Sequence, residues 1–350
     1  MAEAPGRPPT RADRERAVRA YAAHLCAGGG ETWGRWRAHL TGQEPFDATG
    51  PLPGGAQLEV VRRLVRLPAA DLPGLADLVL HTPAPGRGRV EAPLPWPGLA
   101  EPPGPAPVAP DRLPDDELLR VCLGVLSDLC CRLVAADPGP APVPWRRAVA
   151  RRLRRSRGPV VLQGGPLELM MAQRWTEGVA AGEGVGWPRL WRRAEARGRL
   201  PGRVDLAGRA RRAAERHGAG RVVVRLDAEP PQIGSPDLVG VDLWCRLNPV
   251  LAHRALDGGA VARVLRRLLV PDEPAVRTLS VPEPQRAWAQ GRARRMADRL
   301  TRGAETAGYA VHGDPEVLRR GVDGPRRIPV GQTLALAVRA CDRAWQEVNR

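Results

Sequence analysis

The runs PVVL (residues 159–162) and RVVVRL (residues 221–226) decide the fold class of this 350-residue chain. Both are short apolar runs rich in valine, which is typical of strands buried in a sheet. The first run breaks at GGP (residues 164–166), and amphipathic segments follow before the second run begins. A strand, a turn, helices and a second strand form a βα crossover unit, which is the building block of a parallel sheet. The sequence therefore predicts an α/β domain around this stretch.

The same patterns predict further elements on both sides of this unit. The segment from Leu238 to Leu247 fits either a short strand or a helix, and residues 309–312 fit a short strand. Asp314 followed by Pro315 predicts the start of a brief helix. Apolar residues at helical spacing predict longer helices at 13–26, 57–65, 115–136, 252–269, 284–307 and 333–348. We therefore expect a helix-rich α/β fold with a small parallel sheet of βα units flanked by helices and Pro-rich linkers.

Composition predicts where the domains begin and end. Residues 1–12 form an expected disordered tail, and 13–81 an expected helical region. Residues 82–114 hold eleven prolines and predict a linker, although Val90, Leu94 and Trp96 could also anchor this segment onto the core. Residues 115–157 predict a helical segment with an Arg-rich end. Residues 158–350 predict the α/β domain, closed by a C-terminal helix.

Arginine alone supplies the positive side-chain charge that the chain carries at neutral pH. All 54 basic residues are Arg, and the net charge is +16. This usage is typical of a very GC-rich bacterial genome, so it says little about function. The charge would still attract nucleic acid, anionic lipid or acidic glycan over about 8 Å at physiological salt. Seven arginines lie within residues 146–157 and fit either a phosphate-binding helix or a solvated helix face.

The spacing of the cysteines and the composition of the first residues indicate the cellular compartment of the protein. The six Cys form no C-x-x-C pair and have no His at ligand spacing, so we expect free thiols, no disulfide and no metal. The first residues lack the apolar core of a signal peptide, and no apolar run is long enough to span a membrane. We therefore expect a reduced, cytoplasmic protein.

Two parts of the chain resemble each other. Trp33 and Trp36, followed by LPG (residues 52–54) and LVL (residues 78–80), match the order of Trp187 and Trp191, LPG (residues 200–202) and VVV (residues 222–224). If this similarity is structural, it predicts a duplicated helix–helix–strand unit, with residues 78–80 as a strand. In a sequence so rich in Arg, Gly, Pro and Ala, chance produces such matches as well.

Residues 158–318 resemble bacterial sulfotransferase-like proteins. The resemblance rests on VVL (residues 160–162), the segment from Leu167 to Trp175, the Trp187–Trp191 pair and the run GAGRVVV (residues 218–224). The tail from Trp288 to Asp314 is also similar. The resemblance implies an α/β fold that binds 3′-phosphoadenosine-5′-phosphosulfate through a Gly-rich loop and a cation after the central strand.

This sequence departs from the family at both phosphate anchors. GGG (residues 28–30) follows a helix and carries neither the cation nor the hydroxyl of a phosphate loop. The Arg that the family places after the central strand falls at Gly165, or at Gln163 with a small shift. Each lost charge-assisted hydrogen bond costs about 1.5–3 kcal/mol. We therefore expect no cofactor and no sulfate transfer; an active enzyme would be a sulfotransferase-like transferase.

A weak anion site remains conceivable at the turn. Gly164 and Gly165 would present backbone N–H groups at the positive end of a helix dipole, with Pro166 as first helical residue. Glu168 in that first turn opposes an anion, so cations would have to come from elsewhere. The candidates are Arg174, Arg189, Arg192 and Arg193.

Two functions of different classes follow from the sequence. The first is a non-catalytic sulfotransferase-like protein that serves as a binding or partner subunit, with a protein or an anionic glycan as partner, in envelope glycan modification. The second is a nucleic-acid-binding or regulatory protein that uses its Arg-rich surface, with non-specific binding at low salt. Trp145 is the one aromatic residue beside the densest Arg run, and no DNA-binding motif is present.

Overall fold

A computed structural model of the chain describes residues 20–21, 55–67, 72–82, 115–136, 158–227, 237–254, 256–270, 276 and 278–350. The chain divides into two compact units, one made of residues 1–133 with 330–350 and the other of residues 134–329. The expected tail at 1–12, the helix at 13–26 apart from residues 20–21, nearly all of the Pro-rich linker and the Arg-rich run lie outside the described residues.

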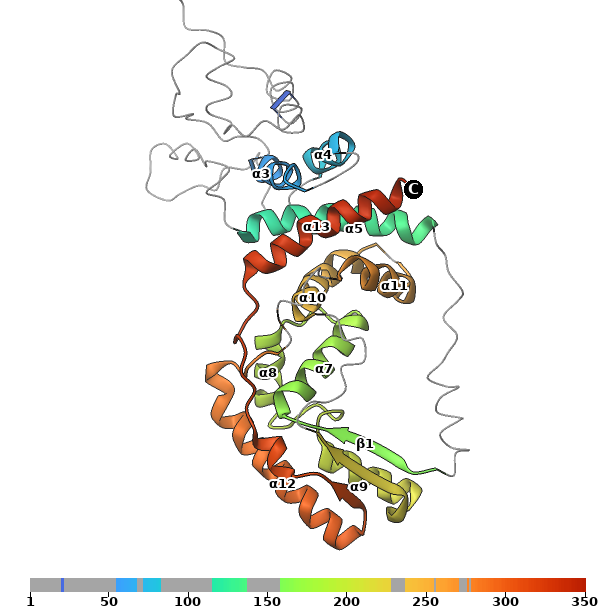
Figure 1. The fold of residues 1–350 in the computed structure, drawn as a ribbon, viewed down its shortest axis with the longest axis vertical. Coiled ribbons are helices and arrows are strands. Elements are labelled where there is room, and N and C mark those ends of the chain that lie inside the picture. The colour runs from blue at the N-terminus through green and yellow to red at the C-terminus, as the bar shows by residue number, and fades with distance from the viewer. Residues whose placement is uncertain are drawn as a thin grey trace, which may run out of the picture. The chain divides into compact units, whose positions relative to one another are not determined.

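The first unit is helical throughout its described part (Figure 1). Helix α3 packs against α4 and α13, and the Cys341 thiol of α13 lies 3.8 Å from the Cys122 carbonyl oxygen of α5. Three acidic residues begin α5, where they face the positive end of its dipole. Its helices are α3 (Gly55–Leu64), α4 (Leu72–His81), α5 (Asp115–Ala136) and α13 (Val330–Val348).

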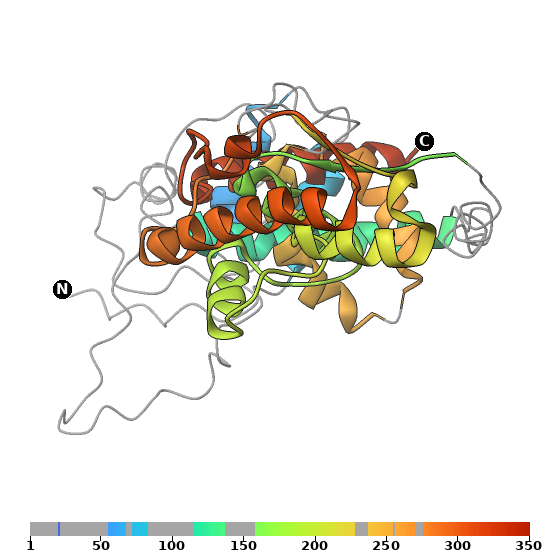
Figure 2. The ribbon, with the colours of Figure 1, turned by 90° about the horizontal axis from the view of Figure 1, so that it is seen from below.

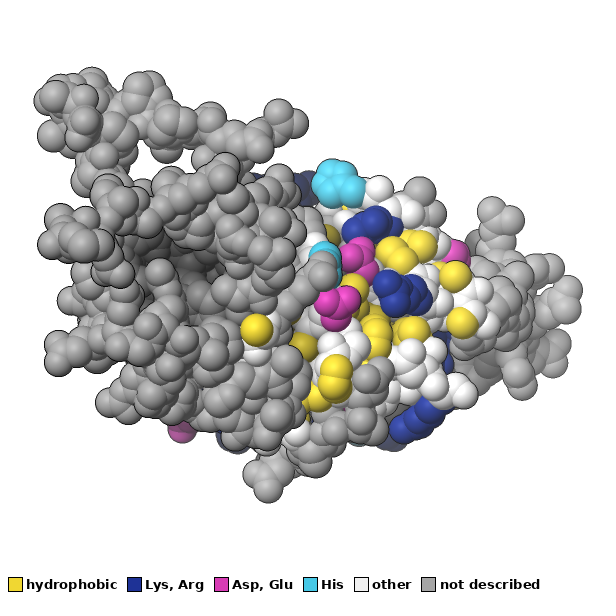
Figure 3. All heavy atoms as spheres, turned by 90° about the horizontal axis from the view of Figure 1, so that it is seen from above, with side chains coloured by type: hydrophobic (Ala, Val, Ile, Leu, Met, Phe, Trp, Pro, Cys, Tyr) yellow, Lys and Arg dark blue, Asp and Glu magenta, His cyan; other side chains and the backbone are white. Residues whose placement is uncertain are grey.

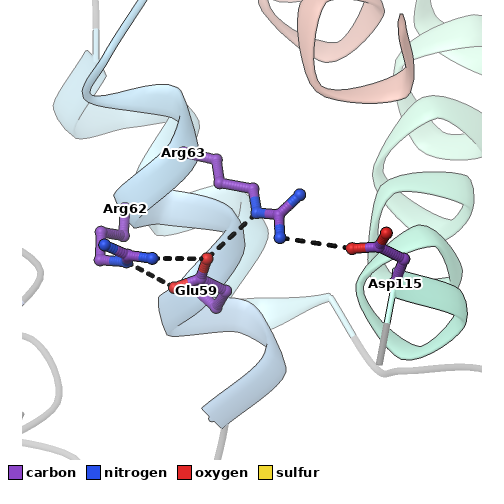
Figure 4. A network of polar contacts seen from close by, with 4 residues as sticks. All are labelled: Glu59, Arg62, Arg63 and Asp115. Atoms are coloured by element: carbon purple, nitrogen blue, oxygen red, sulfur yellow. Dashed lines mark hydrogen bonds and ion pairs between the residues drawn. The ribbon is translucent and has the colours of Figure 1, made fainter. Parts of the chain in front are cut away.

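A buried carboxylate ties α3 together and links it to α5. Glu59 is only 1% exposed and accepts hydrogen bonds from Arg62 at 2.5 and 3.0 Å and from Arg63 at 3.0 Å. Arg63 also reaches the Asp115 carboxylate at 3.4 Å (Figure 4). Two guanidinium groups therefore neutralise a carboxylate that would be costly to bury alone.

In Figure 3, hydrophobic side chains lie between Arg, Asp and Glu side chains over the described part of the face shown.

The second unit is built on the expected parallel sheet. Strands β1 (Val160–Gly164), β2 (Val222–Leu226) and β3 (Ala310–His312) lie in the order β1-β2-β3, and both pairings are parallel. Val161 pairs with Val223, and Val223 pairs with Ala310. The fold class predicted from the sequence is therefore confirmed for the described residues: helix-rich α/β with a small parallel sheet.

Three of the described α-helices of the second unit begin at a capping aspartate. Asp205, Asp237 and Asp257 each accept a backbone hydrogen bond at a helix start, which satisfies one of the free N–H groups there. The α-helices are α7 (Leu167–Ala180), α8 (Trp187–Ala196), α9 (Leu206–His217), α10 (Leu238–Ala252), α11 (Gly258–Leu268) and α12 (Arg286–Ala307). The 3-10 segments described are Ala219–Arg221, Glu283–Gln285 and Pro315–Arg319.

Two of these helices cover a single face of the sheet. Helix α9 contacts β1 and β2, α12 contacts β3, and the two helices also contact each other (Figures 1 and 2). Consecutive parallel strands joined by crossovers of one hand place every crossover helix on the same side. Leu162, Val224 and Leu226 point to this side and are buried.

Several sequence expectations differ from the structure. The run at 78–80 lies inside α4, so the proposed duplication fails, because its counterpart at 222–224 is a strand. Residues 238–247 are helical, as part of α10. The helix expected from Ala252 begins only at Gly258, because α10 extends through Ala252 and Asp257 starts the next helix.

The C-terminal helix also differs from its expected place. The sequence assigned it to the α/β domain, but α13 packs with α3 in the first unit. Its buried face, which includes Leu334, Leu336 and Cys341, is apolar and fits any helical layer, so the pattern alone could not choose the domain. None of the described helices combines the length and apolar character that crossing a membrane would need.

Candidate functional site

The turn after β1 is packed rather than open. Gly164 and Gly165 are both buried, and the Gly164 carbonyl accepts a hydrogen bond from the Asp227 backbone at 3.0 Å. A Cβ at Gly164 would lie 2.3 Å from a Leu206 methyl carbon. This glycine therefore allows α9 to approach β1 closely, which is a packing role. Pro166 lies one position earlier than expected, as the N-cap of α7.

The start of α7 already has a carboxylate beside it. Burial raises the pKa of Glu168, and a hydrogen bond from its own backbone N–H opposes that rise. The backbone amide of Glu168, in the first turn of α7, is thus engaged by its own side chain. An anion bound here would also meet the Glu168 charge. The turn consequently offers a poor seat for phosphate or sulfate.

Arg174 is held by a partner of its own. Its Nη2 atom lies 2.6 Å from Oε1 of Glu183, across the turn that ends α7. A Cβ at Gly178 would lie 2.4 Å from Nη1 of Arg174, so the absence of a side chain at Gly178 leaves room for this pair. Freeing Arg174 for a ligand would break the pair. Among the described residues, no hydrogen bond or ion pair joins the turn at Gly164–Gly165 to any of the four candidate arginines.

The other three candidate arginines lie on α8, and tryptophans hold that helix in place. Trp175, Trp187, Trp191 and Trp288 form a chain of ring contacts with centroids 5.8, 5.6 and 6.4 Å apart. Trp187 donates to the Ser280 carbonyl at 3.0 Å, and Trp175 donates to the Val185 carbonyl at 2.7 Å. Three of these rings are at most 2% exposed. One face of α8 is therefore fixed in a packed aromatic core.

The opposite face of α8 carries only arginine charge. Helix geometry places Arg189, Arg192 and Arg193 within about 100° of one another, on the face away from Trp187, Leu190 and Trp191. All three are exposed. None of their side chains has a hydrogen bond or ion pair among the described residues. The one acidic residue of α8, Glu195, accepts a hydrogen bond from Gln285 at 3.0 Å instead.

Two further arginines extend this surface beyond the helix. Arg197 and Arg199 follow in the turn that ends α8 and are also exposed without described partners. Gly198 permits that turn, because its φ is +60°. The sequence analysis missed both residues, although they continue the Arg spacing of the helix. We call the five residues the α8 arginine face: Arg189, Arg192, Arg193, Arg197 and Arg199.

The α8 arginine face differs from many of the other exposed arginines of the second unit. Elsewhere many are paired: Arg203 with Glu177, Arg299 with Asp205 at 3.0 Å, and Arg319 with both Asp298 and Glu316 at 2.7 Å. Such pairs neutralise part of the excess positive charge. Among the described residues no carboxylate forms such a pair with the arginines of the α8 arginine face, so their positive charge is not offset in this way.

Four of the five described cysteines are buried, and Cys131 is partly exposed. Burial raises the pKa of Cys130 and that of Cys245 to about 12 each, so neither is a thiolate near neutral pH. The five described cysteines are free thiols, and Cys26 lies outside the described residues. No group of three His, Cys, Asp or Glu side chains that could hold a metal is found in the described ranges.

An open hollow on the second unit is lined by Gln290, Arg294, Glu316 and Arg319 and has a volume of about 490 Å³. Since Arg319 is paired with Glu316 and Asp298, only Arg294 of α12 brings charge without a described partner. The hollow is therefore a weaker candidate than the α8 arginine face.

In comparisons with known proteins, no family model, no curated protein and no solved structure matches this chain.

Proposed function

We propose that this chain is a non-catalytic binding or partner subunit with a sulfotransferase-like sheet, and that it holds an anionic glycan on the α8 arginine face. The observation that supports this proposal most is the charge of Arg189, Arg192 and Arg193, which have no ion-pair partner in the described part of the chain, on a helix fixed by tryptophans. An enzyme role has less support, because Arg174 and the backbone amide of Glu168 are already engaged.

The spacing of the charges suits a polymer better than a small anion. Arg189 and Arg193 lie one turn apart, about 6 Å along the helix axis, and the other members extend the row. A repeated sulfate or carboxylate group could contact successive guanidinium groups, each through a charge-assisted hydrogen bond. Because α8 is already ordered, these contacts would cost little further backbone entropy.

Envelope glycan modification is the setting that the sulfotransferase-like resemblance suggests. In that role the chain would hold an acidic glycan or a modifying enzyme's product and would transfer nothing itself. A cytoplasmic location remains part of this proposal, with reduced thiols and no metal.

Nucleic acid is the second candidate, and the same arginines favour it. The aromatic rings of α8 are turned into the core, where Trp187 and Trp191 are at most 2% exposed, so they offer no stacking platform for bases. Binding to nucleic acid through this face would rest on phosphate contacts alone and would be independent of sequence.

A binding titration separates the two ligands and tests the surface. The purified chain is titrated with heparin, as an anionic glycan, and with duplex DNA of similar total charge at physiological salt. We expect tighter binding to heparin, and at least about tenfold weaker binding after the triple change Arg189→Ala, Arg192→Ala, Arg193→Ala.

A matched control removes the same three charges elsewhere. Arg211 pairs with Glu215, and Arg286 and Arg326 both pair with Glu283. Changing these three to Ala should weaken heparin binding less than threefold or so, since the lost charge is partly neutralised already. Equal losses in both triple variants would mean that net charge, and not the α8 arginine face, causes the binding. Sequence-specific DNA binding at physiological salt would favour the second candidate.

A further inference from the structure

The described helices that pack most closely on the three-stranded sheet of the second unit, α9 and α12, lie on one face, and among the described residues the other face carries exposed side chains. Side chains alternate along a strand, so Val161, Val223 and Ala310 point away from the face that α9 and α12 cover. Val161 is 45% exposed, Ala310 is exposed and Val223 is half-buried. All-parallel sheets are almost always covered on both faces. The apolar strip formed by these three residues is therefore unusual for a parallel sheet.

A row of polar side chains lies beside this strip. Gln163 on β1 pairs in register with Arg225 on β2, and Arg225 pairs with His312 on β3. All three are exposed, and none has a hydrogen bond or ion pair among the described residues. Adjacent strands lie about 4.8 Å apart, so the row crosses the sheet over about 10 Å. Its centre is the Arg225 guanidinium, flanked by two groups that can also hydrogen-bond.

We propose that this open face docks an amphipathic helix of a partner protein, with apolar residues over Val161, Val223 and Ala310 and a carboxylate on Arg225. Helices are the elements that cover parallel sheets, and one helix of about 10 Å diameter matches the width of three strands. A covering helix would remove Arg225 from water. An unpaired buried charge is costly, so the covering surface must supply an anion, and a carboxylate matches the guanidinium geometry.

A second copy of this chain fits the face less well. In a twofold dimer the same patch meets itself, so each strip would face the other across the symmetry axis. The Arg225 side chains would then approach each other, or approach His312, without any carboxylate in the row. Charge complementarity therefore favours an acidic partner over a second copy. The inference concerns a surface separate from the α8 arginine face, so either can fail while the other holds.

A selection experiment tests the proposal without knowledge of the natural partner. The full chain is used to select from a phage-displayed library of amphipathic helical peptides. We expect the enriched peptides to carry Leu, Ile or Val at helical spacing together with one Asp or Glu. Synthetic versions should bind the Arg225→Glu variant at least about 30-fold more weakly, as expected for a desolvated charge pair.

Reciprocal changes and a control complete the test. Replacing the peptide carboxylate by Lys should restore binding to the Arg225→Glu variant. The matched control is Arg216→Glu on α9, which makes the same charge change at another exposed arginine and should leave peptide binding within about twofold. Val161→Asp should also abolish binding, and circular dichroism checks that each variant is folded.

Three outcomes would overturn the proposal. Enriched peptides without an acidic residue would remove the role of Arg225. Equal binding by the Arg225→Glu and Arg216→Glu variants would place the peptides elsewhere. A stable dimer in sedimentation that Val161→Asp dissociates would show that a second copy covers the face.

Discussion

The tryptophan cluster gives the sharpest test of how α8 is held. Trp191 is fully buried, yet its Nε1–H has no hydrogen-bond partner among the described residues, whereas Trp187 donates to the Ser280 carbonyl at 3.0 Å. Changing either residue to Phe removes the same atoms, so the cavity costs are similar and largely cancel in a comparison. What differs is the hydrogen bond that each change removes or spares.

The expected difference follows from the cost of each polar group. Trp187→Phe loses a hydrogen bond with a net contribution of about 1 kcal/mol, while Trp191→Phe removes an unsatisfied donor that costs about 1–3 kcal/mol to bury. Trp187→Phe should therefore lower the free energy of unfolding more than Trp191→Phe does, by about 2 kcal/mol or more. Trp175→Phe is the matched control, because Trp175 donates to the Val185 carbonyl and should behave like Trp187.

Urea unfolding followed by far-UV circular dichroism measures this difference without depending on tryptophan fluorescence. The m-values should stay equal among the three variants, so that midpoint shifts report stability. If Trp191→Phe were as destabilising as Trp187→Phe, the inferred hydrogen-bonding difference between the two indoles would be wrong.

Three further predictions concern the rest of the chain. Glu59→Gln should lower the stability of the first unit by about 2 kcal/mol in urea unfolding, because two partly buried arginines lose their carboxylate, whereas Asp77→Asn at an exposed pair should change it by less than about 0.5 kcal/mol; similar effects would contradict the role of burial. Burial raises the pKa of the Cys130 and Cys245 thiols to about 12, so these thiols stay protonated in the folded chain at a pH where unfolded cysteines ionise. The free energy of unfolding should therefore hold its full value below about pH 9 and fall toward pH 12, by up to about 1.4 kcal/mol per pH unit for each thiol. A urea-unfolding series over this pH range measures the fall, which Cys130→Ala should make less steep. Calorimetry with 3′-phosphoadenosine 5′-phosphate should show binding no tighter than about millimolar, and micromolar binding that Arg174→Ala removes would restore a nucleotide site to this sheet.

The sequence was sufficient for the strands and for most helices. Valine runs located β1 and β2, the short run YAVH (residues 309–312) located β3, and periodic apolar residues located α5, α12 and α13. It failed at 78–80, where a short apolar run within a longer helix looks the same as a strand. It also could not assign α13 to the first unit, since an apolar helix face does not specify its neighbour.

The candidate site was predicted only in part. The sequence names the arginines of α8 as candidate cations for the turn at Gly164, but it could not show that Trp187, Leu190 and Trp191 form the buried face of this helix and leave the arginines on the exposed face. The engagement of Arg174 by Glu183 depends on a contact across the turn that ends α7 and on the space left at Gly178, which only the fold brings together. The open sheet face was hidden for the same reason: strand order decides which face the crossover helices cover.

The salt dependence of heparin binding tests the central claim most directly. For polyanions such as nucleic acids, each neutralised charge contributes about 0.7–0.9 to the slope of log K against log salt. The change Arg189→Ala, Arg192→Ala, Arg193→Ala should reduce that slope by about 2 to 3, whereas the control change of Arg211, Arg286 and Arg326 should reduce it by less than about 1. Unchanged slopes in the α8 variant, or an equal reduction in the control, would contradict the assignment of α8 as the anion-binding surface.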